Sequence, residues 1–255
     1  MRSVPFPITA VILAKNEEAV MAECIESIRD VVDEVLVIDS GSTDETKNLA
    51  EAAGAIVLNT EWLGYSDTKN WGNLQASHDL IFSLDADERA DAQLRTELSR
   101  VRQDGFTGIG AFRRKNYYGH HWVRYGGWYP DWKSRLFDRR TTRWEGKYVH
   151  ERLIGRQPQV ELNGNIIHLT VRDRTHHRQT IEKYARLNAQ RLVDAGKSSH
   201  GLAALLSTCW TFARIFFLKA GFLDGVTGWY VAVGSARAKW LRHHYYIELT
   251  KHPHG

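Results

Sequence analysis

The chain has 255 residues, of which 43% are apolar, and this composition excludes an intrinsically disordered protein. Its two cysteines are too few for a disulfide framework, which favours a reducing compartment. The net charge of +4 conceals an uneven distribution. Residues 1–100 hold 8 Lys and Arg against 19 Asp and Glu, whereas residues 101–255 hold 26 against 11, which indicates two parts with separate tasks.

Strand and helix patterns alternate through the first hundred residues. Continuous apolar runs predict buried strands, and apolar residues at helical spacing fill the segments between them. This alternation predicts a parallel sheet with right-handed crossovers, and ligands bind such sheets at the carboxyl ends of the strands. The predicted strands are 8–14, 35–38, 55–58 and 80–84, and the predicted helices are 17–29, 43–53, 66–77 and 90–102.

The pattern changes after residue 105. Aromatic residues, Arg, His and Gly are frequent up to residue 170, and long helical patterns follow. No run reaches 18 uncharged apolar residues, and the N-terminus lacks the features of a signal peptide, so we expect no conventional transmembrane helix. The predicted strands here are 109–113, 134–137 and 165–169, and the predicted helices are 175–195, 201–220 and 225–249.

Asp85-Ala86-Asp87 directly follows the predicted strand 80–84. Two carboxylates separated by one residue can face a common point, and hard oxygen ligands suit Mg²⁺ or Mn²⁺ bridging to a diphosphate. Such an ion neutralises the charge that develops on a departing nucleotide. A D-x-D sequence alone is usually a solvated loop, but its position after a buried strand favours the metal site.

Further polar residues lie beside the predicted strands. Asp39, at the end of strand 35–38, can accept hydrogen bonds from a ribose or from the N–H of a uracil ring. Asn16 and Glu17 follow the first strand and can line the same pocket, although a helix N-cap also explains them. Lys69 can meet phosphate or base, and the alternative is a solvated side chain.

Four stretches in this order resemble the nucleotide-sugar domain of inverting family 2 glycosyltransferases, which have the GT-A fold: VILAKNEE, VLVIDSGSTDET, Lys69-Asn70-Trp71-Gly72 and LIFSLDADE. The later stretches RLFDRR, YVHERL, IIHLTVRD and KAGFLDGVTGW resemble a bacterial branch that contains lipopolysaccharide core β-1,4-glucosyltransferases. The resemblance implies an α/β GT-A fold with a mainly parallel sheet, a UDP-sugar donor, a divalent metal and inversion at the anomeric carbon. It also implies a cytoplasmic location, peripheral on the inner face of the bacterial inner membrane.

The same resemblance assigns roles to single residues. It implies that Asp39 binds the uridine, Asp85 the ribose or the metal, and Asp87 the metal. Residues 1–105 then form the nucleotide-sugar-binding half and residues 106–174 the acceptor-binding part of the same domain. Residues 175–255 form a C-terminal helical extension.

An inverting transferase needs a base that deprotonates the acceptor hydroxyl. In family 2 this is usually the aspartate of a Glu-Asp pair after the D-x-D, and no such pair follows here. Glu151 is the first candidate and Asp131 the second, while a salt bridge with Arg152 is the alternative role of Glu151. His150 or His168 is a candidate third metal ligand, against the alternative of a hydrogen-bonded structural histidine.

Tryptophans, tyrosines and arginines interleave over residues 117–144. Aromatic faces stack on sugars and arginines hold phosphates, so both features fit a phosphorylated glycolipid acceptor. We expect Trp128, Trp132 and Arg135 to contact that acceptor, although some of the tryptophans belong to the core. Single-stranded nucleic acid is the competing partner, and we reject it because no RNA-binding signature is present.

Apolar residues recur at helical spacing between Leu202 and Phe217, with Arg214 and Lys219 beside them. A basic amphipathic helix of this kind can lie in a membrane interface, and the alternatives are packing on the sheet or a dimer interface.

The predicted function is transfer of a hexose, glucose from UDP-glucose, to a lipopolysaccharide inner-core sugar by a single displacement with metal-assisted departure of UDP. The alternatives are a family 2 transferase for a capsule or glycoprotein glycan, and an inactive sugar- or lipid-binding protein on the same scaffold.

Overall fold

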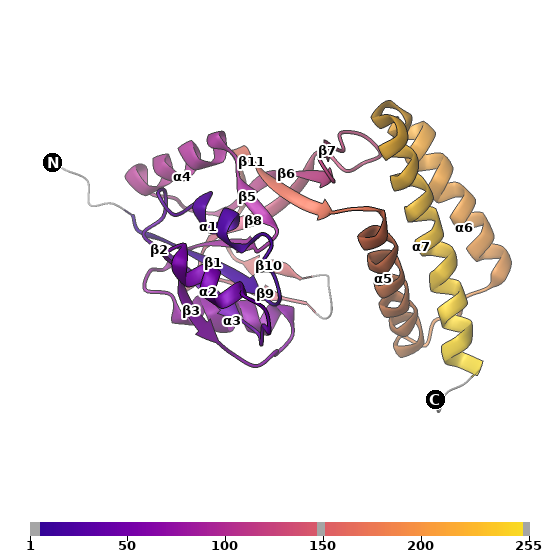
Figure 1. Cartoon of the computed structure of the whole chain (residues 1–255), viewed down its shortest axis with the longest axis horizontal. Coiled ribbons are helices and arrows are strands. Elements are labelled where there is room, and N and C mark those ends of the chain that lie inside the picture. Colours follow the sequence, from indigo (N-terminus) through magenta and orange to yellow (C-terminus); the bar gives the residue numbers. More distant parts are fainter. Residues whose placement is uncertain (1–5, 147–150, 252–255) are drawn as a thin grey trace. The chain divides into compact units, whose positions relative to one another are not determined.

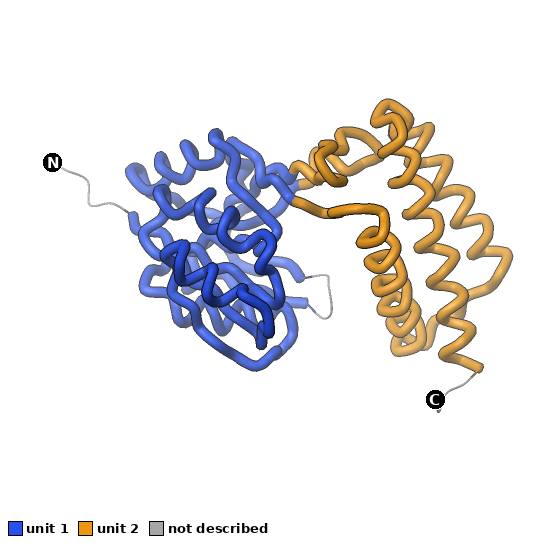
Figure 2. The backbone as a smooth tube through the Cα atoms, viewed as in Figure 1, with its two compact units in different colours: residues 1–114, 132–168 blue, residues 115–131, 169–255 orange. Residues whose placement is uncertain are grey.

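A computed structural model describes residues 6–146 and 151–251. The chain divides into two compact units (Figure 2). Unit 1 comprises residues 1–114 and 132–168, and unit 2 comprises residues 115–131 and 169–255. Strands β6 (Ile109–Tyr118) and β11 (Gln159–Val171) begin in unit 1 and end in unit 2.

The sheet of unit 1 has apolar residues on both of its faces. Ile8, Ala10 and Ile12 of β1 (Ile8–Ala14) belong to one core cluster, and Val11 of the same strand belongs to a second. This burial on both faces explains why the strand is a continuous apolar run without alternation. Residues of α1, α2 and α4 join the first cluster, and the second receives Trp71 of α3 and Trp144.

The strand order of the sheet is β3-β2-β1-β4-β8-β6-β11-β5, with β7 paired to β6. Strands β3, β2, β1 and β4 are mutually parallel, as predicted, and the direction changes at β8, which is antiparallel to β4. The other strands of the sheet are β2 (Glu34–Asp39), β3 (Ile56–Asn59), β4 (Leu80–Asp85), β5 (Glu88–Ala90), β7 (His121–Trp122) and β8 (Asp131–Asp138). Strand β9 (Thr142–Glu145) pairs with β10 (Arg152–Gly155) as a separate hairpin.

The helices of unit 1 are α1 (Met21–Glu26), α2 (Thr46–Ala52), α3 (Tyr65–Gln75) and α4 (Ala92–Asp104) (Figure 1). The helix predicted from residue 90 begins later, because Glu88–Ala90 forms the short strand β5 and pairs with β11. Asp91 then caps α4, since its side chain accepts a hydrogen bond from the backbone N–H of Leu94. The sequence prediction also missed the hairpin of β9 and β10.

Unit 2 contains the three predicted long helices, α5 (Arg174–Asp194), α6 (Gly201–Ala213) and α7 (Gly225–Lys251), and α7 lies between the other two (Figure 1). Helix α6 ends earlier than the predicted range of 201–220. A π-helical turn, η1 (Arg214–Leu218), and a 3₁₀ turn, η2 (Gly221–Asp224), connect α6 to α7. Gly228 approaches this connection so closely that a Cβ atom there would lie 1.8 Å from the carbonyl oxygen of Gly221. This close approach gives the stretch KAGFLDGVTGW a structural role.

By length and composition alone, Gly201–Leu218 is apolar enough to cross a membrane. The sequence pattern predicts an interfacial rather than a transmembrane helix here, because Arg214 interrupts the run of uncharged residues.

Candidate active site at the carboxyl ends of the strands

The predicted carboxylates lie on either side of the end of β1. In the strand register, Asp39 of β2 lies beside Ala14, and Asp85 of β4 lies beside Leu13. Parallel pairing thus brings to one edge two residues that are far apart in the sequence, as the α/β pattern predicts.

Asp39, the last residue of β2, is completely buried at the start of a turn. Its Oδ2 atom accepts hydrogen bonds from the backbone N–H groups of Gly41 and Ser42, each at 3.0 Å. Gly41 has a positive φ of 92°, which favours glycine in this turn. Among the residues described, nothing hydrogen-bonds to the buried Oδ1 atom of Asp39. A buried carboxylate oxygen without a donor can accept a hydrogen bond from an incoming N–H or O–H group.

The loop after β1 is fastened to the turn that contains Asp39. The backbone N–H of Asn16 donates to Ser42 Oγ at 2.9 Å, and the side chain of Asn16 accepts from the N–H of Thr43 at 2.8 Å. The N–H of Glu17 donates to Thr46 Oγ1 at 2.8 Å. Asn16 and Glu17 therefore position this loop through hydrogen bonds between the two loops.

Lys69 of α3 joins Asp85 to Glu151. Its buried ammonium group donates to Asp85 Oδ1 and to Glu151 Oε1, each at 2.9 Å. The ammonium also lies 4.7 Å from the ring centroid of Trp144. Asn70, the next residue, exchanges two hydrogen bonds with the backbone of Trp144, which fastens α3 to β9. The predicted lysine thus lies between two carboxylates.

Arg135 holds Asp85 from the other side. Its guanidinium donates to Asp85 Oδ2 at 2.6 Å and to both oxygens of Glu88, at 2.6 and 2.7 Å. Burial alone would raise the pKa of Asp85, but the charges of Arg135 and Lys69 outweigh it and hold this pKa well below its usual range. Asp85 therefore remains a carboxylate in a fixed orientation.

Glu88 is the buried carboxylate that joins the members of this network, and the sequence pattern did not single it out. It is 0% exposed and accepts hydrogen bonds from Arg135, from Arg114 at 3.1 Å and from the backbone N–H of Asp85 at 3.1 Å. Its only sequence signal is its place directly after the D-x-D. Arg114 and Arg135 come from β6 and β8, so the pairing depends on the fold of the sheet.

Asp87 lies beside His168. The pairing of β5 with β11 places His168 opposite Glu88, and His168 Nε2 is 3.1 Å from Asp87 Oδ2. Carboxylate oxygen and imidazole nitrogen are both ligands that Mn²⁺ accepts. Of the two histidines predicted as alternatives, His168 is beside the D-x-D, and His150 lies outside the described residues. Within residues 6–146 and 151–251, no three His, Cys, Asp or Glu side chains form a preformed metal cluster.

The residues predicted to bind the acceptor lie in different places. Arg135 is only 4% exposed and forms ion pairs with Asp85 and Glu88. It is the buried counter-charge of these two carboxylates and does not belong to an open sugar-binding surface. The ring of Trp132 lies 5.8 Å from the guanidinium of Arg113. Trp128 and Asp131 belong to unit 2, where both accept hydrogen bonds from the side chain of Asn116.

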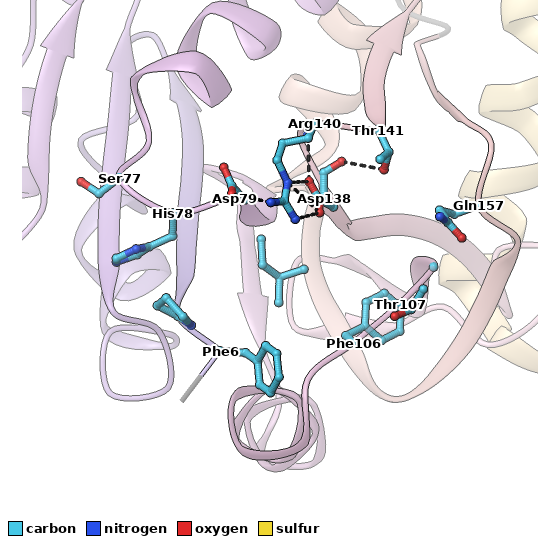
Figure 3. A pocket seen from close by; sticks show the side chains of 13 residues that line it. Phe6, Ser77, His78, Asp79, Phe106, Thr107, Asp138, Arg140, Thr141 and Gln157 are labelled. Carbon is cyan, nitrogen blue, oxygen red and sulfur yellow. Dashed lines mark hydrogen bonds and ion pairs between the residues drawn. The ribbon is translucent and has the colours of Figure 1, made fainter. Parts of the chain in front are cut away.

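A separate hollow of about 440 Å³ lies at the opposite end of the strands (Figure 3). Pro7 and Leu80, at the amino ends of β1 and β4, contribute to its lining. Arg140 there is paired with Asp138 and Asp79. The charged groups of this hollow therefore already have partners, and it is distinct from the edge that carries Asp39 and Asp85.

Replacing Glu88 by Ala is expected to lower the free energy of unfolding by about 3 kcal/mol, because the buried guanidinium of Arg135 loses its main partner. Urea denaturation measures this change. The control is Glu145→Ala, which removes an exposed ion pair of 3.6 Å with Arg143 and should cost less than about 1 kcal/mol. Equal losses in the two variants would show that Glu88 is no more important than a surface carboxylate.

Comparisons with known proteins identify the family of this chain. The family model of glycosyl transferase family 2 matches residues 9–157. An uncharacterized glycosyltransferase of Rickettsia prowazekii (strain Madrid E) is 28% identical over 92% of this chain and 85% of its own. The lipopolysaccharide core biosynthesis glycosyltransferase LpsC of Rhizobium meliloti (strain 1021) is 29% identical over 93% of each chain.

Among solved structures, glucosyl-3-phosphoglycerate synthase of Mycobacterium tuberculosis, in complex with Mn²⁺, UDP and glucosyl-3-phosphoglycerate, is similar to part of the chain. It is 29% identical over 45% of this chain and 44% of its own, with a TM-score of 0.34.

The fold and the matched family together define a glycosyltransferase with the GT-A fold, followed by helices at the C-terminus. The chain belongs to glycosyl transferase family 2. The family resemblance and the fold class predicted from the sequence are thereby confirmed.

Proposed function

We propose that this chain transfers glucose from UDP-glucose to a sugar of the lipopolysaccharide inner core, with inversion at the anomeric carbon. The observation that carries the proposal is the bridge through Lys69, which joins the D-x-D to a second carboxylate, Glu151. An inverting transferase needs two groups in one site: one beside the departing nucleotide, and a base beside the acceptor hydroxyl. The similarity to LpsC over nearly the whole chain supports the choice of acceptor.

The donor's uridine is assigned to the Asp39 turn. The buried Oδ1 atom of Asp39, which no described residue contacts, suits the N–H of a uracil ring or a ribose hydroxyl. Asn16 and Glu17 hold the adjoining loop. Lys69, with Asp85 and Glu151 as its partners, contributes positive charge near the diphosphate.

Asp87 and His168 provide two ligand atoms that fit a divalent ion, and Asp85, two positions before Asp87, is the further predicted ligand. Adjacent ligands on an ion with bonds of about 2.1 Å lie about 3 Å apart, and the two donor atoms of Asp87 and His168 are 3.1 Å apart. When bound, Mn²⁺ or Mg²⁺ supplies positive charge that stabilises the leaving diphosphate. The side chain of Asp85 is held in place for this role by Lys69 and Arg135.

Glu151 is the proposed base. Lys69 holds its Oε1 atom, while the buried Oε2 atom has no hydrogen-bond partner among the described residues. Oε2 then takes the proton of the acceptor hydroxyl as the new glycosidic bond forms and UDP leaves. Asp131 remains the second candidate. In this proposal residues 1–105 bind the nucleotide sugar, residues 106–174 bind a phosphorylated glycolipid with Trp128 and Trp132, and the enzyme works at the cytoplasmic face of the inner membrane.

A thermal-shift screen of nucleotide sugars with Mn²⁺ tests the donor assignment. A ligand at 100 times its Kd stabilises the folded state by about 2.7 kcal/mol, which corresponds to a rise in Tm of about 5 °C or more. We expect this rise with UDP-glucose and UDP, and no rise with GDP-mannose. A rise with GDP-mannose alone would contradict the uridine assignment. Binding of UDP-glucose without release of UDP in the presence of inner-core acceptor would instead indicate an inactive sugar-binding protein.

A further inference from the structure

The outer surface of α6, of the turns η1 and η2 and of the start of α7 is apolar. Six large side chains there have between 48% and 71% of their surface exposed: Leu202, Leu206, Trp210, Phe217, Phe222 and Trp229. We call this set the apolar face of unit 2. Leu202, Leu206 and Trp210 follow each other at intervals of four residues, so they lie on one side of α6. Exposed apolar surface of this extent marks a place where something binds.

The apolar face rests on a packed support. Ala204, Thr211 and Ile215 are buried on the inner side of α6 and η1, and Ile215 packs in a cluster with Val231 and Ala232 of α7. On the same support the ring of Trp229 lies 5.3 Å from that of Phe212 and 5.6 Å from that of Phe216. The exposed side chains therefore project from ordered helices and keep a fixed arrangement.

The segments that carry the apolar face have an excess of positive charge. Residues 201–247 contain five Lys and Arg and a single acidic residue, Asp224. Asp224 is buried and accepts hydrogen bonds from the backbone N–H groups of Arg124 and Tyr125, so it does not neutralise the surface.

Three of the basic residues are near neighbours. Burial and then the charges of Arg242 and Arg214 lower the pKa of Lys239. In the part of the chain that the structure describes, Arg214, Lys239 and Arg242 make no ion pair, and the Nε atom of Arg242 is buried without a partner. A cluster of cations without acidic partners attracts phosphate groups.

We propose that the apolar face of unit 2 docks into one leaflet of an anionic membrane, with its leucines and aromatic rings among the acyl chains and Arg214, Lys239 and Arg242 at the lipid phosphates. An amphipathic helix with basic residues at its border and aromatic residues on its apolar side binds bilayers in this way. This proposal deepens the proposed function. It rests on that function only for the purpose of docking, which is to bring the enzyme to a glycolipid acceptor that is itself anchored in a membrane.

A second copy of the chain fits the same face less well. A two-fold dimer would bury the same face of both copies, and so would bring two sets of these cations into one interface without acidic partners. Like charges at an interface oppose association, whereas anionic lipid headgroups complement them.

A helix that crosses the whole bilayer is also disfavoured, although Gly201–Leu218 is long enough. The inner side of α6 packs on α7, and α7 packs on α5 through Ala185, Ala189 and Tyr245. Helix α5 carries many charged residues, which would be costly within hydrocarbon. A helix pair with one apolar side is suited to an orientation in the membrane plane.

Vesicle flotation of the full chain, without nucleotide sugar or acceptor, tests the proposal. We expect binding to vesicles of phosphatidylcholine with about a quarter of phosphatidylglycerol, weakening at high salt. The double variant Trp210→Ser/Phe217→Ser should bind at least about tenfold more weakly. The control Leu74→Ser replaces a still more exposed apolar residue, in unit 1, and should bind as the parent does. Absence of flotation, or equal binding of the double variant, would overturn the proposal.

Two further measurements separate the membrane from the other occupants. Arg214→Gln/Lys239→Gln/Arg242→Gln should lose the preference for anionic over neutral vesicles, while unchanged preference would overturn the phosphate contacts.

Cys209 is exposed and Cys24 is buried, so a fluorophore can be attached selectively to α6. Shallow quenchers in the lipid should act on it more strongly than deep ones. Stronger quenching by deep ones, or a dimer in sedimentation that the double variant abolishes, would refute docking in one leaflet. Transferase activity on a soluble acceptor is independent of all these outcomes.

Discussion

Replacing Asp87 by Asn is expected to lower metal-dependent turnover by about two to three orders of magnitude. The carboxylate of Asp87 lies beside His168, and the amide of Asn has a similar shape but a much weaker affinity for Mn²⁺. Because Asp87 is partly exposed, the fold should be unaffected. The measurement is the initial rate of UDP release from UDP-glucose with acceptor, as a function of the concentration of Mn²⁺.

A matched control separates metal binding from the loss of one charge. Asp30→Asn makes the same change at an exposed carboxylate and should keep the rate of the parent. The variant His168→Gln should raise the concentration of Mn²⁺ needed for half-maximal rate, because one of the proposed ligands is removed. Full metal-dependent turnover in Asp87→Asn would mean that the D-x-D does not hold the ion.

The location of the site could be predicted from the sequence because it depends on the parallel strands. Strands β1, β2 and β4 are apolar runs, since the sheet is covered on both faces there, and a run of this kind is visible without an alignment. Asp39 and Asp85 follow two such runs directly, and parallel pairing then brings both to the end of β1.

The partners of these carboxylates could not be predicted in the same way. Arg135 and Glu88 are 47 positions apart, and they meet because β8 follows β4 in the sheet and β5 returns beside β11. No local pattern encodes that pairing. Trp144 is a similar case: it lies in an aromatic segment typical of sugar binding, yet it packs beneath Lys69 because Asn70 fastens its backbone to α3.

The charge asymmetry of the chain also has a structural explanation. In unit 1, basic residues from the second part of the sequence neutralise acidic residues from the first, as Arg135 does for Asp85 and Arg139 for Asp79. Basic residues after residue 201 have few acidic neighbours. The excess positive charge is therefore concentrated in the helices of unit 2, where the proposed membrane surface lies.

Replacing Glu151 by Gln is expected to lower kcat by about two orders of magnitude or more, while the affinity for UDP changes little. The amide oxygen of Gln can still accept the hydrogen bond of Lys69, so the bridge to Asp85 is retained, but the side chain can no longer take a proton. Single-turnover rates and UDP binding by calorimetry measure the two quantities separately.

The control for this change is Glu145→Gln, an exposed glutamate six positions away that should leave both quantities unaltered. If Glu151→Gln keeps the rate of the parent, the role of base passes to Asp131, and Asp131→Asn should then show the loss. If instead UDP binding and kcat fall together, Glu151 acts through Lys69 on the nucleotide site, because the cation that it shares with Asp85 has moved. The split between binding and turnover therefore distinguishes proton transfer from positioning at this carboxylate.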